Sequence, residues 1–363
     1  MTCVDHVLDS LEIGGAERLV IALARHQRRA GARVRVHALY ALGPLAEQLR
    51  DHGIEVVDHQ APSGVLRASR KLLAHFRRSR PDVVHCHNAA ATIAGATAAS
   101  LARVPVAIAT RHGWGRTEGA WRRELKSWLA ARACARVVAV CEAARRALIA
   151  GPLADAKKTV TILNGAEAQQ RGRTAVACDD RCVIVCVARL SWVKNHDTLL
   201  KALALARVQQ PELVLHLVGD GERRGALEAL AAALGISEAV TFLGEREDVG
   251  DCLGDGHAFA LSSVTEGLPV ALLEALAAGL TPIVSDVGGM PEVVQRAGVG
   301  SVVPAGDPGA LAAALVRHAR SRDRWPAWGE TARGAFARHF TIERMCADYD
   351  ALLSQCVAAA ASR

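Results

Sequence analysis

The feature that most constrains the fold is an alternation along the whole chain. Short runs rich in valine and isoleucine alternate with longer segments of helical periodicity. Such alternation is typical of βαβ units, whose strands are parallel. The runs expected to be strands fall into two groups, residues 3–8, 33–39, 54–57, 82–86, 106–110 and 136–140, and residues 182–188, 213–218, 239–243, 257–261, 281–285 and 301–303. The pattern predicts an α/β fold with two doubly wound parallel sheets.

The length of the chain agrees with two domains. At 363 residues it exceeds the size at which a single hydrophobic core stops growing. Residues 165–180, between the two groups, are polar and lack periodicity, which predicts a linker. We therefore expect a first domain at 1–164, a second at 181–340 and a closing helical segment at 341–363.

Charge and apolar content limit the classes of protein. Residues 1–164 hold 25 Lys and Arg against 13 Asp and Glu, whereas residues 165–363 hold 19 against 24, which favours an anionic partner for the first half. No basic segment followed by an apolar run begins the chain, and no apolar run is free of charge and proline for long enough to span a membrane. The ten cysteines form no Cys-x-x-Cys pair. We expect a cytoplasmic protein with no metal site and no nucleic-acid partner.

Two glutamates lie around a predicted helix start in the second half. Glu266 follows the expected strand 257–261, and Pro269 suits the first turn of a helix. Glu274 comes eight residues later, so on a continuous helix the carboxylates would lie about 12 Å apart along one broad face. Free helix amides beside carboxylates suit a ligand with phosphate and hydroxyl groups. The alternative is a pair of ordinary helix glutamates favoured by the helix dipole.

A second candidate site follows the first strand of the second half. Arg189 and Lys194 lie in the loop between the expected strand 182–188 and a helix, in a chain with 38 Arg and only 6 Lys. Two such cations could hold a diphosphate and offset the charge that grows on a leaving group. A solvated loop is the alternative.

The first half holds two weaker candidates, each at the end of an expected strand. Gly14 and Gly15 precede a helix, and paired glycines let helix-start amides approach a phosphate closely. His112 follows the expected strand 106–110, on the same rim of the sheet.

Two other patterns have competing interpretations. Gly219 and Gly221, with Gly225 beyond them, resemble a dinucleotide-binding loop, but the glycine spacing is one residue too long, so a wall for a nucleotide phosphate is favoured. His85 and His87 end a strand and could be metal ligands. No third ligand is evident nearby in the sequence, so a pair of hydrogen-bonded histidines is favoured.

Together these motifs resemble family 4 of the glycosyltransferases, whose GT-B fold has two facing Rossmann-like domains. The resemblance covers nearly the whole chain. Residues 14–17 look like the family's Gly-Gly-x-Glu loop, and Arg189 with Lys194 looks like its phosphate-binding pair. Residues 281–294 resemble the usual continuation of the family's Glu-x7-Glu motif.

The resemblance implies a role for each candidate residue. Glu274 would bind the ribose hydroxyls of a nucleotide-sugar donor, Glu266 would bind the transferred sugar, and His112 would contact that sugar from the opposite domain. The further donor-binding residues would be Gly14, Gly15, Arg189, Lys194, Gly219, Gly221, Arg246, Gly267 and Leu268. Family members retain the anomeric configuration, with a donor phosphate oxygen taking the proton of the acceptor, and need no metal or cofactor. The segment 341–363 would cross back to the first domain.

The acceptor is less constrained than the donor. Arg111 before His112 and Trp114 after it depart from the family pattern, which leaves the acceptor pocket undefined. A basic stretch runs through residues 67–80, and residues 121–129 carry Arg and Lys beside an apolar helical face. That face consists of Trp121, Leu125, Trp128 and Leu129. It predicts either contact with an anionic membrane or an ordinary helix packed on the sheet.

The resemblance therefore implies a retaining, metal-independent glycosyltransferase that uses a nucleoside diphosphate sugar, with UDP favoured over GDP-mannose. Its acceptor would be a hydroxyl group of a glycan, a lipid-linked sugar or a small molecule, in cell-surface glycan, exopolysaccharide or glycolipid synthesis. The alternatives are a dinucleotide-dependent oxidoreductase and a catalytically idle scaffold that binds nucleotide sugar. An anionic surface on the inner face of the cell membrane remains a candidate partner.

Overall fold

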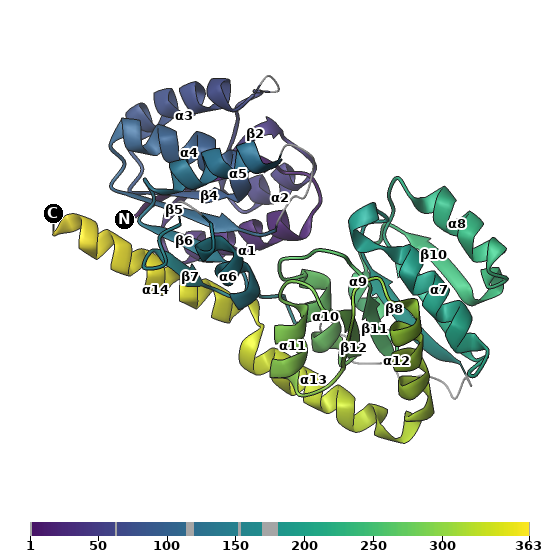
Figure 1. Cartoon of the computed structure of the whole chain (residues 1–363). Helices are drawn as coiled ribbons and strands as arrows, with labels where there is room; N and C mark the ends of the chain where they lie inside the picture. Colours follow the sequence, from purple (N-terminus) through teal and green to yellow (C-terminus); the bar gives the residue numbers. More distant parts are fainter. Residues whose placement is uncertain (1, 62–63, 114–119, 152–153, 169–180, 363) are drawn as a thin grey trace. The chain divides into compact units, whose positions relative to one another are not determined.

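Parallel sheets of seven and six strands form the centres of two units of the chain (Figure 1). The first unit contains residues 1–164 and 342–363, and the second contains residues 165–341. The predicted α/β class with two doubly wound sheets is confirmed. The computed structural model describes residues 2–61, 64–113, 120–151, 154–168 and 181–362, so most of the expected linker 165–180 lies outside the described residues.

The sheet of the first unit has the strand order β3-β2-β1-β4-β5-β6-β7. All neighbouring strands are parallel. The strands are β1 (Cys3–Ser10), β2 (Arg33–Ala41), β3 (Glu55–Asp58), β4 (Val83–His87), β5 (Val106–Arg111), β6 (Arg136–Ala139) and β7 (Thr159–Thr161). The order reverses between β1 and β4, and ligands of open α/β sheets bind at the carboxyl ends of strands beside such a switch point.

The sheet of the second unit has the order β10-β9-β8-β11-β12-β13, again with parallel neighbours. Its strands are β8 (Cys182–Val187), β9 (Leu213–Val218), β10 (Val240–Gly244), β11 (Ala258–Leu261), β12 (Thr281–Ser285) and β13 (Ser301–Val303). Here the switch point lies between β8 and β11.

Helices connect the strands in both units. Those of the first unit are α1 (Gly15–Arg29), α2 (Leu45–Asp51), α3 (Val65–Ser79), α4 (Asn88–Ala102), α5 (Ala120–Ala131), α6 (Glu142–Ile149) and α14 (Ile342–Ala361). Those of the second unit are α7 (His196–Arg207), α8 (Arg224–Ala233), α9 (Val249–Gly254), α10 (Val270–Ala278), α11 (Met290–Ala297), α12 (Pro308–Arg320) and α13 (Trp325–His339). The predicted alternation of strands and helices is thereby confirmed.

The side chains along each strand alternate between the two faces of the first sheet, which gives one apolar face and one partly polar face. Val84 and Cys86 of β4 belong to the apolar cluster formed with α3 and α4. Successive side chains of a strand point to opposite faces, so His85 and His87 lie on the other side. His6 of β1 is paired in register with His85 and shares that side. The sheet therefore buries histidines next to its switch point.

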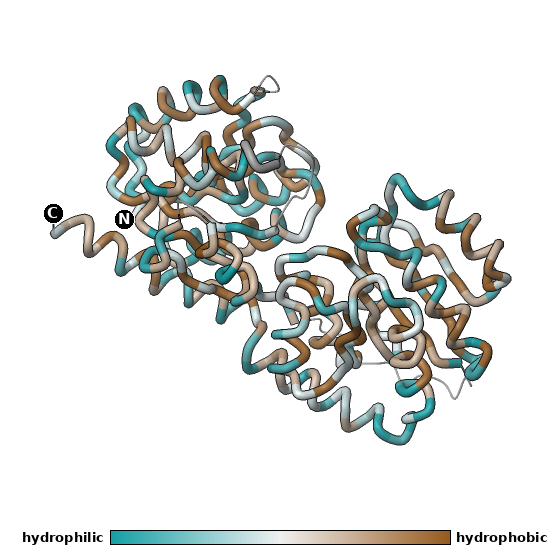
Figure 2. Tube along the Cα trace, viewed as in Figure 1, coloured by the Kyte–Doolittle hydropathy of each residue, from teal (hydrophilic) through white to brown (hydrophobic). Residues whose placement is uncertain are grey.

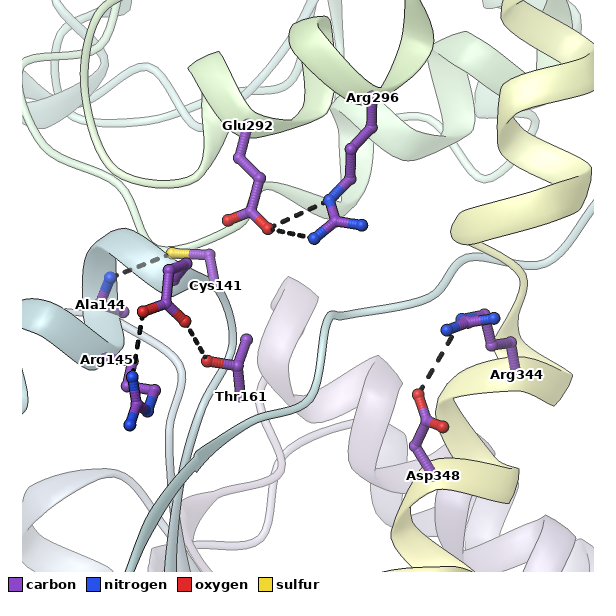
Figure 3. A network of polar contacts seen from close by, with 9 residues as sticks. Cys141, Ala144, Arg145, Thr161, Glu292, Arg296, Arg344 and Asp348 are labelled. Carbon is purple, nitrogen blue, oxygen red and sulfur yellow. Dashed lines mark hydrogen bonds and ion pairs between the residues drawn. The ribbon is translucent and has the colours of Figure 1, made fainter. Parts of the chain in front are cut away.

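The short edge strand β7 was not predicted. It has three residues, of which only Val160 is apolar, so it carries too little pattern to be recognised. Its anchor is Glu142 at the start of α6, whose carboxylate accepts hydrogen bonds from the Thr161 hydroxyl at 2.9 Å and from Arg145 at 3.1 Å (Figure 3). Contacts between distant residues, and not local pattern, define this strand.

The C-terminal helix α14 belongs to the first unit (Figure 1). Its Tyr349 hydroxyl lies 3.1 Å from the Thr110 hydroxyl on β5, and its Asp350 Oδ2 lies 2.7 Å from His26 Nε2 on α1. These contacts cover the partly polar face of the first sheet with a helix from the far end of the sequence.

None of the helices that the structure describes combines the length and apolar character needed to cross a membrane. Helix α3 instead alternates hydrophilic and hydrophobic residues along its length (Figure 2). Its apolar side packs into the first unit through Ala68, Leu72 and Phe76, while its arginines face solvent.

Candidate functional site

In the second unit a charged pair joins the two strands at the switch point. Lys194 ends the short 3-10 helix η1 (Trp192–Lys194) after β8, and Glu266 follows β11. Lys194 Nζ donates to Glu266 Oε1 at 2.5 Å, and the Ser263 hydroxyl donates to the same oxygen at 2.8 Å. The two charged side chains are 23% and 11% exposed. Two residues that the sequence placed in separate sites therefore form one site.

Glu266 and Glu274 do not share a helix, so the expectation that they lie on a common helical face is wrong. Pro269 has an extended backbone with ψ 125° and serves as the N-cap, so α10 begins only at Val270. Proline also disfavours helical backbone at the preceding residue, which keeps the segment after Glu266 in a loop. Glu274 lies half-buried on α10, while Glu266 precedes its first turn.

The loop after β12 holds the backbone beside Glu266. Gly288 has φ +57°, and a Cβ at this position would lie 2.3 Å from the carbonyl oxygen of Glu266. The Gly289 N–H donates to the Gly267 carbonyl at 2.7 Å. Only glycine combines this φ with so close an approach, so the loop fixes the position of Glu266. Leu268 next to it is buried.

The glycines after β9 have a packing role in the structure. Gly219 has φ +129°, and a Cβ there would lie 2.2 Å from the carbonyl oxygen of Ala188. A Cβ on Gly221 would lie 2.6 Å from the carbonyl oxygen of Leu190. Both glycines therefore let their loop lie against the backbone that carries Arg189, whose side chain is exposed. Their donor-binding role stays a prediction.

Arg246 already has an anionic partner in the structure. Its guanidinium donates to both carboxylate oxygens of Asp248, at 2.7 and 2.6 Å, and both side chains are exposed. A donor that binds Arg246 would share this cation with Asp248.

In the first unit a pocket of about 480 Å³ lies at the carboxyl ends of β1, β4 and β5. Gly14 is the N-cap of α1, and Gly15, its first residue, lines the pocket. His112 follows β5 and lines the same pocket. Its backbone N–H donates to Asn88 Oδ1 at 3.1 Å, and Asn88 has φ +68°, a conformation that asparagine tolerates better than most residues. Two predicted site residues, Gly15 and His112, thus meet in one pocket.

The same pocket contains a carboxylate that sequence reasoning missed. Asp9 lies near the end of β1 and lines the pocket beside Glu17. Burial, reinforced by the charge of Glu17, raises the pKa of Asp9 to about 6. Its Oδ1 is buried and accepts no hydrogen bond from the described residues. The signal in the sequence was an aspartate near the carboxyl end of the first strand, the place where such sheets bind ligands.

A buried ion pair forms another wall of this pocket. One guanidinium nitrogen of Arg111 lies 2.7 and 2.9 Å from the two carboxylate oxygens of Glu124 on α5. The side chains are 6% and 13% exposed. Arg111, which departs from the family pattern, therefore orients α5 against the pocket. Trp114, the other departure, lies outside the described residues.

His85 and His87 have a third histidine beside them, so the expectation that none is near was wrong. Ring nitrogens of His6, His85 and His87 lie within 4.8 Å of one another. His6 precedes the other two by about eighty positions, and only the pairing of β1 with β4 brings it close. A fourth histidine, His112, lies next to His87, with its Nε2 3.1 Å from His87 Nδ1.

All of these histidines are neutral at neutral pH. Burial lowers the pKa of His6 and of His112 to about 4. It lowers the pKa of His85 and of His87 well below the usual value. Each ring therefore offers one N–H donor and one acceptor nitrogen.

The apolar face expected on residues 121–129 is partly packed and partly exposed. Trp128 packs against Gly151, where a Cβ would lie 2.7 Å from the indole ring. Leu125 and Leu129 are 36% and 53% exposed. The side chain of Trp121 lies outside the described residues. Trp128 therefore fits the interpretation of a helix packed on the sheet, whereas contact of the exposed leucines with a membrane stays a prediction.

Each half of the chain matches a glycosyltransferase family. Residues 13–170 match Glycosyltransferase Family 4, and residues 173–334 match Glycosyl transferases group 1. EpsF of Bacillus subtilis, which is named as a glycosyltransferase, is 31% identical over 77% of this chain and 78% of its own. The chain belongs to glycosyltransferase family 4. The family assignment gives the oxidoreductase alternative no support.

Two other relatives of this family 4 glycosyltransferase have names that state a reaction. The UDP-Gal:alpha-D-GlcNAc-diphosphoundecaprenol alpha-1,3-galactosyltransferase of Escherichia coli is 28% identical over 67% of each chain. The GDP-mannose-dependent alpha-(1-6)-phosphatidylinositol monomannoside mannosyltransferase of Mycolicibacterium smegmatis is 34% identical over 41% of each chain.

A solved structure supports the fold assignment. HepE of Anabaena in complex with UDP matches this glycosyltransferase with a TM-score of 0.84 at 22% identity, over 98% of this chain and 100% of that one. The GT-B fold, with two Rossmann-like units, is confirmed.

Proposed function

We propose that this family 4 glycosyltransferase moves a sugar from a nucleoside diphosphate sugar to a hydroxyl acceptor, with retention of the anomeric configuration. The observation that carries the proposal is the pair of Lys194 and Glu266 at the switch point of the second sheet, with Glu274 on the helix that follows. A cation beside one carboxylate, with a second carboxylate nearby in sequence, suits a ligand that joins a diphosphate to two sets of hydroxyl groups.

In this proposal each group acts on a stated part of the donor. Lys194 and Arg189 bind the diphosphate and offset the negative charge that grows on it as its bond to the anomeric carbon breaks. The acceptor oxygen attacks that carbon from the same face, and its proton passes to a phosphate oxygen of the leaving group. Glu266 binds hydroxyl groups of the transferred sugar, Glu274 binds those of the ribose, and His112 binds a sugar hydroxyl group in the pocket of the first unit. The two cations take the place of a metal ion, so we propose a metal-independent reaction.

We propose UDP as the nucleotide. The E. coli relative is named for a UDP-sugar and covers two thirds of this chain, whereas the relative named for GDP-mannose covers 41% of it. The structural match to HepE, named as a complex with UDP, agrees with this choice. A panel of UDP-sugars would identify the transferred sugar.

We place the acceptor in the pocket of the first unit. It is lined by hydrogen-bonding side chains, namely Asp9, Glu17, Asn88, His112 and Arg123. Such a lining suits a hydroxyl-rich acceptor such as a glycan, for synthesis of an exopolysaccharide, a cell-surface glycan or a glycolipid. The E. coli relative is named for an acceptor linked to diphosphoundecaprenol, which supports a lipid-linked sugar.

A lipid-linked acceptor requires contact with a membrane surface, and two helices of the first unit suit it. Helix α3 exposes arginines and Leu66, which is 69% exposed, and α5 exposes Leu125 and Leu129 beside Arg123 and Lys126. Apolar side chains among cations bind anionic bilayers. We propose peripheral association with the inner face of the cell membrane. Failure of the purified protein to sediment with anionic vesicles at low salt would rule this association out.

A donor panel tests the enzymatic proposal. We expect one UDP-sugar to raise the melting temperature more than UDP alone, and its sugar to reach a hydroxyl acceptor in the presence of EDTA. Nuclear magnetic resonance of the product should show the anomeric configuration of the donor. Donor binding without hydrolysis or transfer to any acceptor would instead identify an idle scaffold, and inversion would refute retention.

A further inference from the structure

A line of hydrogen-bonded side chains leads from α1 to His112 inside the first unit. Gln27 Oε1 lies 2.8 Å from His6 Nε2, and His6 Nδ1 lies 3.1 Å from His87 Nε2. His87 Nδ1 lies 3.1 Å from His112 Nε2. Gln27, His6 and His87 are all at most 3% exposed. We call these four residues the histidine relay.

The relay has one direction, because each neutral imidazole carries a single proton. Gln27 accepts with its carbonyl oxygen, so the proton of His6 is on Nε2 and its Nδ1 is an acceptor. His87 must then donate from Nε2 and accept at Nδ1. His112 in turn donates from Nε2 and keeps a lone pair on Nδ1.

We propose that Gln27, His6 and His87 are positioning residues that fix His112 as the Nε2–H tautomer, so that its Nδ1 accepts a hydrogen bond from a substrate hydroxyl group. Nδ1 of His112 is buried and has no hydrogen-bond partner among the described residues, and the residue lines the pocket of the first unit. A lone pair at this point selects a ligand that donates, as a sugar hydroxyl does. The substrate contact rests on the proposed function, whereas the tautomer does not.

Neighbouring contacts hold the rings of the relay in place. His85 packs on His87 with ring centroids 4.0 Å apart, and its Nε2 lies 2.8 Å from the Thr110 hydroxyl. That hydroxyl lies 3.1 Å from the hydroxyl of Tyr349 on α14. At the other end, Asn88 accepts the backbone N–H of His112. The relay therefore determines which ring nitrogen of His112 carries the proton, and these contacts fix the orientation of the imidazole rings.

The tautomer can be measured directly on the unmodified protein. Imidazole nitrogen resonances of protein labelled with nitrogen-15 in histidine, assigned with single His→Gln variants, distinguish Nδ1–H from Nε2–H. We expect His112 to carry its proton on Nε2 from pH 6 to pH 8. A proton on Nδ1 would overturn the proposal.

A metal ion held by His6, His85 and His87 would give the opposite result. Such an ion would occupy Nε2 of His87, whose proton would then sit on Nδ1 and point at His112. His112 would accept at Nε2 and carry its proton on Nδ1. Stoichiometric metal in the purified protein together with that tautomer would therefore replace the relay with a metal centre.

Variants of Gln27 test the link between relay and activity. As an ionised carboxylate Gln27→Glu offers only acceptor oxygens, and in that form we expect it to keep the Nε2–H tautomer of His112 and transfer within about threefold of the unmodified enzyme. Gln27→Met has similar length but no acceptor, and we expect mixed tautomers and about tenfold slower transfer, the effect of one hydrogen bond. Gln48→Met on α2, which replaces an exposed glutamine, is the matched control.

Failure of this inference differs from failure of the proposed function. Sugar transfer with His112 protonated on Nδ1 would refute the relay and leave the function intact. The Nε2–H tautomer in a protein that transfers no sugar would keep the relay and refute the function. Should Gln27→Met not fold, the resonances of the unmodified protein and of Gln27→Glu still decide the question.

Discussion

Glu266→Gln should strengthen the binding of free UDP while it slows sugar transfer. Lys194 donates to Glu266 at 2.5 Å, so a diphosphate that binds Lys194 must share or displace this carboxylate. Glutamine keeps the shape of the side chain and the hydrogen bond from Ser263 but carries no charge. A hydrogen bond to a charged group contributes about 1.5–3 kcal/mol. Partial exposure of both side chains reduces the gain to about 1 kcal/mol, or about fivefold tighter UDP binding.

The same variant should lose transfer activity, because the carboxylate is proposed to bind the reacting sugar. We expect kcat to fall about 100-fold, which corresponds to about 2.7 kcal/mol of transition-state stabilisation. Calorimetric titration with UDP measures the first effect, and release of UDP from the donor measures the second.

Glu228→Gln is the matched control for this experiment. Glu228 also pairs with a cation, Arg224 at 2.9 Å, but lies on α8 and is exposed. It changes the net charge equally, so both UDP affinity and kcat should stay as in the unmodified enzyme. Weaker or unchanged UDP binding in Glu266→Gln, with a normal control, would refute the competition between the carboxylate and the diphosphate.

Three further predictions follow from single residues. Burial raises the pKa of Asp9 to about 6, so the folded first unit binds a proton that the unfolded chain releases, and its stability falls as pH rises from about 4 to 6. Asp9→Asn should remove that loss, so the free energy of unfolding at pH 7 should rise by about 3 kcal/mol in urea unfolding experiments. An unchanged pH dependence of stability in this variant would contradict the prediction. Glu274→Ala should weaken donor binding by about 1.5–3 kcal/mol through lost ribose contacts, and equal affinity by calorimetry would exclude that role. Gly288→Ala should lower kcat by displacing Glu266. Gly298→Ala is the control, because Gly298 also has a positive φ of +66° but no atom within 4 Å of the new Cβ, and it should leave kcat unchanged. Equal effects on kcat in the two variants would point to backbone strain alone.

Much of the fold could be read from local pattern. Buried parallel strands are short apolar runs between helices, and every strand except β7 carried enough of this pattern to be recognised. The common face of Glu266 and Glu274 was wrong because the segment between Glu266 and Pro269 is not helical, whereas Pro269 correctly predicted the start of the helix. Its N-cap geometry depends on the backbone at Pro269.

The site was only partly predictable, for a related reason. The sequence marked Lys194, Glu266, Gly15 and His112 as chemistry at the ends of strands, and strand ends converge in any parallel sheet. It did not mark Asp9, since a single aspartate has no distinctive spacing.

The sequence by itself determined which residues follow which strands, because strand and helix periods are local properties of a few neighbouring residues. Only the tertiary structure decided which strand ends become neighbours. The strand order β8-β11 joins Lys194 to Glu266, and the order β1-β4-β5 joins His6 to His87 and His112. These pairings depend on hydrogen bonds between strands that lie tens of residues apart, and no local pattern encodes such bonds. The sequence therefore determines which reactive side chains follow each strand, and the strand order determines which of these side chains come into contact.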